Sequence, residues 1–286
     1  MASRLYSYLL LTKPRIGLLV LLTGAAGLTL EGSLTSDPGR FALVLAGLFL
    51  VSGSANALNQ FFEREIDAIM SRTRVKRPLP TGRLAPAEAL VFAGLIGVAG
   101  VWTFAGWFNL ASAGLSLFAI LFYGVFYTVW LKPRTHLNIV VGGVAGALAP
   151  VISWLAAAGS VGLVPLLLFA IVFFWSPPHF WALALYLKED YRRAGLPMLP
   201  LVKGDRRTVE AILSYSLVLF AASLALIPAG AGIVYTVACL GLGVVFLVKA
   251  LALKRELTPA RERALFSYSI VYLCLLFAAI IIDGLV

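Results

Sequence analysis

The sequence is short of charged residues, which make up only 13% of its 286 residues. A soluble globular domain usually carries roughly 25%. Hydrophobic residues reach 61% and the mean hydropathy is +0.95, so this composition is typical of a chain whose solvent is a lipid bilayer. The soluble globular classes are thereby excluded.

Cysteine and histidine are also scarce, with two of each. Cys239 and Cys274 lie in apolar stretches without the close spacing of zinc ligands, and we interpret them as small core residues. At the N-terminus, Met1–Lys13 has no small-residue cleavage site, and Lys13-Pro14-Arg15 interrupts the apolar run that follows. We therefore expect an uncleaved N-terminus and location in a bacterial cell (inner) membrane.

Long apolar runs recur along the whole chain. A membrane-spanning helix needs roughly 20 mostly apolar residues, and nine runs of about that length are separated by Gly, Pro or charged residues. We predict an all-α, polytopic membrane protein whose single domain covers residues 1–286. The expected spans are 16–35, 41–62, 86–107, 110–130, 137–158, 162–186, 209–229, 231–252 and 265–285.

Acidic residues are fewer than basic ones, 13 against 23. If the nine spans alternate in direction, 22 of the 23 Lys and Arg residues fall on one side of the membrane and only Arg40 on the other. The positive-inside rule then predicts a cytoplasmic N-terminus and an extracytoplasmic C-terminus. We expect no nucleic-acid partner, because the net charge of +10 is divided among short loops.

Ionisable residues crowd the end of the second span, where polar groups are costly. Asn59, Glu63 and Asp67 are four residues apart, so a helix would place all three on one face. Carboxylate and amide oxygens suit Mg²⁺, which also binds water and substrate phosphate oxygens. Three downstream basic residues could bind the same phosphates: Arg72, Lys76 and Arg77. The alternative is that the charges simply mark a solvated helix end.

A second polar segment ends the sixth span. It begins with Pro177-Pro178-His179 and reaches Lys188 and Asp190. Two consecutive prolines should break or kink a helix, and membranes tolerate irregular backbone only where it is buried in protein or lines a cavity. We therefore expect His179 to face a ligand pocket, although an interhelical hydrogen bond is the alternative.

A third polar group lies between the fourth and fifth spans. Substrate contact and a merely basic loop that sets topology are equally compatible with it. Its members are Tyr127, Lys132, Arg134, Thr135, His136 and Asn138.

These motifs resemble the protoheme IX farnesyltransferase family, a branch of the intramembrane aromatic prenyltransferase superfamily. The resemblance runs nearly end to end and is carried by Lys13-Pro14-Arg15, Asn59 through Asp67, Arg77 through Gly82, Asn138 through Gly143, and Pro177 through Leu183 with Asp190-Tyr191 and Pro197 through Pro200. Most of the superfamily has an Asn-x-x-x-Asp-x-x-x-Asp first motif. Here Glu63 replaces the middle Asp, and His179 stands near the first Asp of the second motif, as expected for the heme-modifying branch.

The resemblance implies nine helices around a central cavity, with Mg²⁺ as cofactor. It implies transfer of the farnesyl group of farnesyl diphosphate to a vinyl group of heme B, with water addition, to give heme O. Membrane lipid and a downstream heme A synthase are the further partners it suggests. The implied catalytic and metal-binding residues are Asn59, Glu63, Asp67 and Asp190. The implied substrate-binding residues are Arg72, Lys76, Arg77, Lys132, Arg134, His179, Lys188 and Tyr191.

Two alternatives remain open at this stage. The acceptor could be a quinone precursor or a chlorophyll-like ring, which would keep the reaction class. A transporter is the alternative from another class, since intramembrane charges are typical of transporters. Both polar motifs fall at helix ends on the same side, which favours a one-sided active site.

Overall fold

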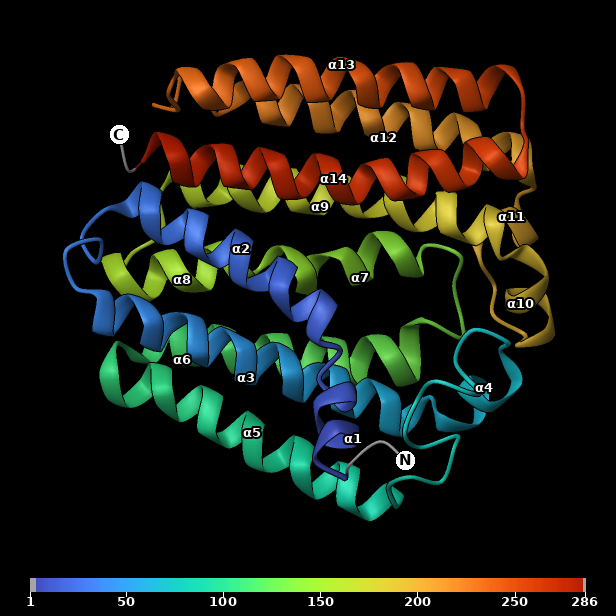
Figure 1. Cartoon of the computed structure of the whole chain (residues 1–286), viewed down its shortest axis with the longest axis horizontal. Helices are drawn as coiled ribbons and strands as arrows, with labels where there is room; N and C mark the ends of the chain where they lie inside the picture. The colour runs from blue at the N-terminus through green and yellow to red at the C-terminus, as the bar shows by residue number, and fades with distance from the viewer. Residues whose placement is uncertain (1–3, 285–286) are drawn as a thin grey trace.

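The computed structural model describes residues 4–284, which are almost entirely helical and contain no strand (Figure 1). This confirms the predicted all-α class. Residue 285 of the ninth predicted span and residues 1–3 of the N-terminal prediction lie outside the described residues. The elements are α1 (Arg4–Leu11), α2 (Pro14–Glu31), α3 (Pro38–Phe62), α4 (Arg64–Ile69), α5 (Pro86–Trp107), α6 (Leu110–Leu121), η1 (Phe122–Leu131), α7 (Asn138–Ala147), α8 (Ala149–Ala158), α9 (Leu163–Tyr186), α10 (Lys188–Arg193), α11 (Leu199–Val202), α12 (Asp205–Ala225), α13 (Ile233–Arg255) and α14 (Pro259–Asp283).

Nine segments of the described chain are long and apolar enough to cross a membrane, as predicted. Two of them are composite: α6 continues into η1, and α7 continues into α8. The seventh and ninth predicted spans begin four and six residues too late, because α12 and α14 each start with a charged turn that continues the helix beyond the apolar run. Apolar patterns locate the buried part of a helix better than its solvated end.

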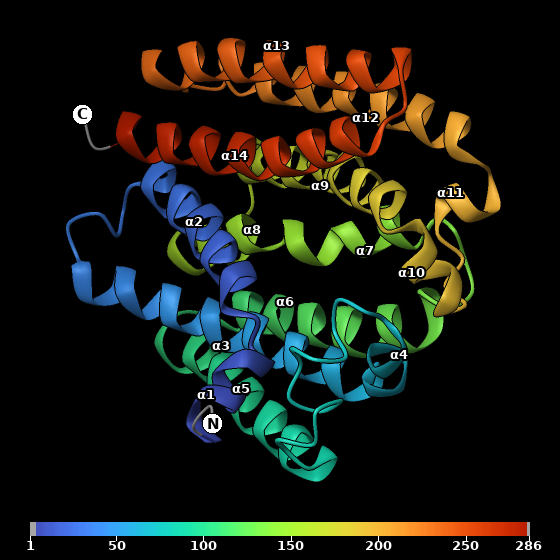
Figure 2. The same cartoon turned by 45° about the vertical axis from the view of Figure 1, so that its right-hand side comes forward.

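The helices form a bundle with the middle spans between two outer groups. Helices α12, α13 and α14 lie on one side with α9, while α3, α5 and α6 lie on the other (Figures 1 and 2). Helix α9 packs against α7, α12 and α14, and α2 packs against α8, α14 and α3. The short helices α4, α10 and α11 gather at one end of this bundle (Figure 2).

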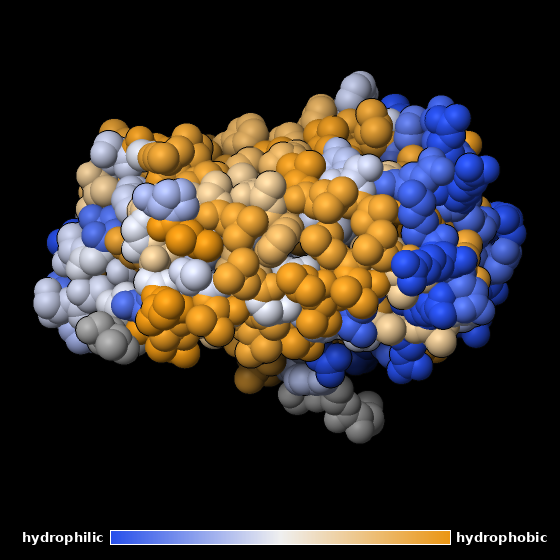
Figure 3. All heavy atoms as spheres, turned by 90° about the horizontal axis from the view of Figure 1, so that it is seen from above, coloured by the Kyte–Doolittle hydropathy of each residue, from blue (hydrophilic) through white to orange (hydrophobic). Residues whose placement is uncertain are grey.

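The surface is divided along the long axis of the bundle. Figure 3 shows a hydrophobic belt across the middle of the face in view, with the most strongly hydrophilic surface at the end that carries α4, α10 and α11. Large apolar side chains are also exposed on α5, on the opposite side of the bundle, for example Trp102 at 69% and Val98 at 71%. Because a water-facing patch of this size would aggregate, the belt is a lipid-facing surface. The chain is therefore a multi-pass membrane protein.

The consecutive prolines of α9 do not break it. The helix runs without interruption from Leu163 to Tyr186 with Pro177 and Pro178 inside it, so of the predicted break or kink the break is wrong. Proline has a helical φ, and its cost comes from the missing N–H and the clash with the preceding turn. The close packing of α9 on three neighbouring helices holds the backbone in place, and Ser176 donates a hydrogen bond to the Val172 carbonyl one turn earlier (3.0 Å).

Helix α3, which carries the first polar motif, is fixed by close packing on α5. At Gly97 an added Cβ would lie 2.6 Å from Ser54 Oγ, and at Gly100 it would lie 2.9 Å from a Val51 methyl group. The two backbones can approach because glycine has no side chain at these points. Ser54 also donates to the Ala93 carbonyl on α5 (2.8 Å).

Candidate functional site

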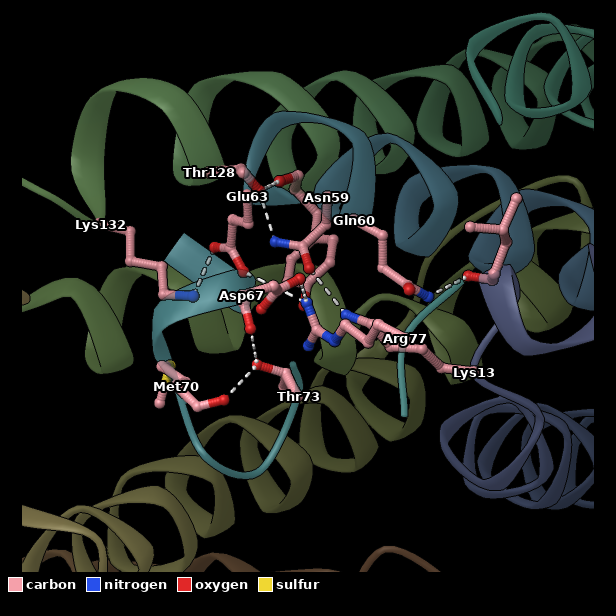
Figure 4. A network of polar contacts seen from close by, with 12 residues as sticks. Lys13, Asn59, Gln60, Glu63, Asp67, Met70, Thr73, Arg77, Thr128 and Lys132 are labelled. Atoms are coloured by element: carbon pink, nitrogen blue, oxygen red, sulfur yellow. Dashed lines mark hydrogen bonds and ion pairs between the residues drawn. The ribbon is translucent and has the colours of Figure 1, made fainter. Parts of the chain in front are cut away.

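The first polar motif lies at the junction of α3 and α4. Glu63 separates the two helices, yet the backbone N–H of Glu63 still donates to Asn59 (3.0 Å) and that of Asp67 to Glu63 (2.8 Å). The spacing of four therefore keeps all three side chains in one polar network (Figure 4). Asn59, Glu63 and Asp67 are only 2%, 4% and 2% exposed. A solvated helix end is therefore the wrong interpretation of these residues.

Three cations surround these acceptors. Lys132 pairs with Glu63, and Arg77 pairs with Asp67 while its Nη1 lies 3.8 Å from Glu63 Oε2. Lys13 Nζ donates to Asn59 Oδ1 (2.7 Å). Figure 4 shows the three cations arriving from different segments of the chain. With two carboxylates and three cations, the network holds one surplus positive charge at a largely buried place, where even the Arg77 and Lys132 side chains are only 16% and 17% exposed.

The charged groups of this network shift one another's pKa values. Burial raises the pKa of Glu63, but Lys132 and Lys13 outweigh it and hold that pKa below its usual value. Burial raises the pKa of Asp67 above its usual value, although Arg77 opposes the rise. Burial and the neighbouring Arg77 lower the pKa of Lys13 well below its usual value. The network therefore keeps Glu63 as its most firmly ionised acid.

Lys13 was not among the predicted site residues. Its backbone is left-handed (φ 51°), a conformation that costs a non-glycine residue of order 1–3 kcal/mol. Surrounding contacts hold it there: Gln60 donates to the carbonyls of Leu10 and Leu11 (both 3.0 Å), and Asn56 donates to that of Thr12 (3.2 Å). The only sequence signal was a lysine before proline at the start of an apolar run.

The segment that faces the first motif from beside α3 is η1, a π-helix that the sequence did not predict. In η1 the N–H of Lys132 donates to the Tyr127 carbonyl five residues earlier (2.8 Å). Thr128 donates to the Tyr123 carbonyl (2.7 Å) and accepts from Asn59 Nδ2 (3.0 Å). Such wider turns often mark functional sites. Here the turn aligns Thr128 and Lys132 with the first motif.

The second motif contacts the first through Asp190, which is 4% exposed. Its carboxylate accepts from Ser71 Oγ (2.8 and 2.7 Å) and from the Ser71 N–H (3.3 Å), and it pairs with Arg193. Burial raises the pKa of Asp190, but the hydrogen bonds from Ser71 outweigh it and lower that pKa below its usual value. Ser71 lies in the loop after α4, so the two motifs are joined at one end of the bundle.

The remaining predicted residues make their side-chain contacts outside this network, although the backbone N–H of Arg72 also donates to Asp190. Lys188 pairs with Asp205 (2.6 Å), and Arg134 donates to the carbonyls of Val129 and Trp130 at its own helix end. Arg72 and Lys76 are exposed on the loop after α4, Tyr191 is buried in the apolar core, and His179 contacts α14.

The comparison with known proteins assigns the family. Residues 20–280 match the model of the UbiA prenyltransferase family. The chain belongs to that family. It is similar to the protoheme IX farnesyltransferase of Aromatoleum aromaticum, with 44% identity over 99% of this chain and 93% of the relative. The enzyme of the same name from Gloeobacter violaceus is 44% identical over 100% and 94%.

The fold agrees with this family. The structure of a UbiA homologue from Archaeoglobus fulgidus bound to GPP and Mg²⁺ has a TM-score of 0.68 and 17% identity over 96% of this chain and 99% of the other. At that identity the likeness shows the fold, and the chemistry of the site in this chain has to be argued from its own residues.

The donor set of this UbiA-family site fits Mg²⁺. It offers two carboxylates and an amide oxygen, which are the hard ligands this ion prefers. No cluster of three His, Cys, Asp or Glu residues close enough to hold a metal by themselves occurs in residues 4–284, so a bound ion needs water or ligand oxygens to complete its shell. A diphosphate provides such oxygens, and the three cations provide its counter-charge.

Proposed function

We propose that this UbiA-family protein is a protoheme IX farnesyltransferase, which joins the farnesyl group of farnesyl diphosphate to a vinyl group of heme B and adds water to give heme O. The observation that carries the proposal is the buried network in which Lys13, Arg77 and Lys132 outnumber Glu63 and Asp67. The names of the relatives supply the two substrates.

The network suits a magnesium diphosphate in charge and in atom types. The oxygens of Asn59, Glu63 and Asp67 would hold Mg²⁺, with Asp190 contributing from the second motif. The ion, when bound, neutralises charge on the diphosphate and so makes it a better leaving group. A fully ionised diphosphate ester with one Mg²⁺ carries one negative charge, which equals the surplus positive charge of the protein network.

The cations have a second role in this proposal. While no substrate is bound, Lys13, Arg77 and Lys132 neutralise the site's acceptors. When the diphosphate enters, they turn to its oxygens. The C1–O bond of the farnesyl ester then breaks, and the diphosphate leaves with the electron pair toward these fixed positive charges. Their geometry is set before the reaction, so little reorganisation is needed as charge develops.

Two bonds form on the vinyl group of the heme acceptor. Farnesyl C1 joins the terminal carbon of a heme vinyl group, and the hydroxyl of a water molecule joins the adjacent carbon with release of a proton. The apolar interior of the bundle would hold the farnesyl chain and keep bulk water from the allylic cation before the carbon–carbon bond forms.

The orientation in the membrane belongs to the same proposal. The site lies at the strongly hydrophilic end of the bundle, and the distribution of Lys and Arg favours a cytoplasmic position for that end. We therefore place the protein in the bacterial inner membrane with the site open to the cytoplasm, where membrane lipid surrounds the belt and a heme A synthase receives the product.

The decisive experiment incubates the purified full chain with heme B, farnesyl diphosphate and Mg²⁺ and detects heme O by mass analysis. Heme O should form and should disappear with EDTA. Asp67→Asn should abolish turnover in a folded protein. Glu65→Gln is a matched control, since its carboxylate is 85% exposed and pairs only with Arg64, and it should leave turnover unchanged. Conversion of a quinone precursor instead of heme B would overturn the acceptor, and substrate flux without transfer would overturn the enzyme.

A further inference from the structure

His179 is held in a way that leaves one ring nitrogen available. Its Nδ1 lies 2.6 Å from Ser269 Oγ on α14. Ser269 Oγ donates its single proton to the Phe266 carbonyl (2.6 Å), so it can only accept from the histidine. The hydrogen-bond network therefore assigns the proton of the neutral imidazole to Nδ1 and leaves a lone pair on Nε2.

The hydrogen bond that His179 makes to Ser269 uses Nδ1, and no hydrogen bond joins its Nε2 to another described residue. The side chain as a whole is only 8% exposed. The lone pair of this nearly buried imidazole thus has no protein donor among the described residues.

The ring plane of His179 is fixed on both faces. Trp175 stacks on it with centroids 4.5 Å apart and 16° between planes, and Phe266 stacks with 4.7 Å and 25°. Trp175 is itself anchored to α14, because its Nε1 donates to the Ser269 carbonyl (2.7 Å). This is the arrangement of a metal-binding histidine, in which a second-shell acceptor on one nitrogen fixes the tautomer and the direction of the other.

The depth of His179 is compatible with the active site. It lies seven residues before the end of α9, which corresponds to roughly 10 Å along a helix. Beyond that end, α10 carries Asp190, and Asp190 is bonded to Ser71 of the first-motif loop. His179 therefore lies within the membrane at the same end of the bundle as both motifs, at a depth where apolar ligands reside.

We propose that Nε2 of His179 ligates the iron of the heme substrate and so holds the porphyrin in the site. This rests on the proposed function, which provides a heme as acceptor. Neutral imidazole is a common axial ligand of heme iron, and iron is the only centre of heme that uses an aromatic nitrogen lone pair. Ser269 is then a positioning residue, since it acts only through His179.

The chain offers a direct test because its two histidines are His136 and His179. His136→Ala leaves His179 as the only imidazole, provided that the purification tag contains no histidine. This full-length variant, labelled with ¹⁵N-histidine, is loaded with ferric heme B without farnesyl diphosphate and studied by pulsed EPR. We expect a ¹⁵N hyperfine coupling from an iron-bound nitrogen. Its absence in heme-loaded protein would overturn the inference, whatever the behaviour of other variants.

Two substitutions give an independent affinity readout. Ser269→Ala should weaken heme binding about tenfold, the low end for loss of a second-shell partner. Ser216→Ala is its matched control, because Ser216 is equally buried and bonds only within its own helix, and it should bind heme normally. His179→Ala should shift the Soret band, and added imidazole should restore it; an unshifted band counts against ligation.

The outcome separates this inference from the proposed function. Heme O formation by a protein without the ¹⁵N coupling would retain the function and reject ligation by His179. A protein that binds neither heme nor converts it would reject the function together with the ligand.

Discussion

Arg77 is the cation whose removal tests the charge network most sharply. It is the partner of buried Asp67 and lies near Glu63, and its own side chain is 16% exposed. Arg77→Met keeps much of the volume and removes the charge. The surplus positive charge of the network then falls to zero, and Asp67 loses its ion-pair partner.

Two effects of Arg77→Met can be estimated. Removing one partner of a buried ion pair destabilises a protein by about 3–5 kcal/mol, and the partial exposure of Arg77 places this change near the lower end. A hydrogen bond between charged groups contributes about 1.5–3 kcal/mol. If Arg77 binds the diphosphate, KM for farnesyl diphosphate should rise roughly 10- to 150-fold. Adding Asp67→Asn should recover stability, because no buried carboxylate is then left without its ion-pair partner, but it should not recover turnover.

The assay measures heme O formation against farnesyl diphosphate concentration, with thermal unfolding in detergent in parallel. Arg83→Met is a matched control from the same loop, because Arg83 bonds the Lys76 carbonyl and Thr81 but no carboxylate. It should leave KM unchanged. If Arg77→Met folds and binds farnesyl diphosphate with wild-type affinity, Arg77 does not bind the diphosphate.

Three further predictions concern neighbouring residues. Lys13→Met should raise KM for farnesyl diphosphate about tenfold, the effect of roughly 1.4 kcal/mol. The melting temperature should fall little, because burial disfavours the charged ammonium of Lys13. A normal KM in steady-state kinetics would contradict this prediction. Thr128→Val should lower the unfolding free energy by about 1–3 kcal/mol, since the buried amide of Asn59 loses its acceptor. Thr103→Val is the control in the same melting assay and should have little effect, because Thr103 lies at an exposed site and bonds only to its own helix. Ser71→Ala should raise the Mg²⁺ concentration needed for half-maximal activity several-fold, because Asp190 loses its hydrogen bonds from the Ser71 hydroxyl. An unchanged Mg²⁺ titration would argue against the link between the motifs.

Local sequence pattern determined the spans. Burial of about 20 apolar residues is a property of a continuous segment, so composition alone located all nine spans, with their starts at most six residues from the observed ones. The spacing of Asn59, Glu63 and Asp67 likewise placed them on one face, because helical geometry repeats every 3.6 residues. The expectation survived the helix break at Glu63 because the backbone hydrogen bonds of the same spacing persist across it.

Only the tertiary structure decided which charges meet. Lys13 and Lys132 are 46 and 69 residues from the acceptors they contact, and no periodicity encodes such distances. Lys188 lies two residues from Asp190, yet it pairs with Asp205. The direction of a side chain at a helix end depends on which neighbouring helix packs beside it.

The backbone of two spans was also decided by packing. The sequence predicted a break or kink at Pro177, whereas α9 packs on its neighbours without a break, and the sequence gave no sign of the π-helix of η1. Local propensity sets the cost of a backbone conformation, whereas contacts with other helices determine whether the fold adopts it. The sequence by itself thus determined the membrane bundle and its first motif, and interhelical packing assembled that motif into a site.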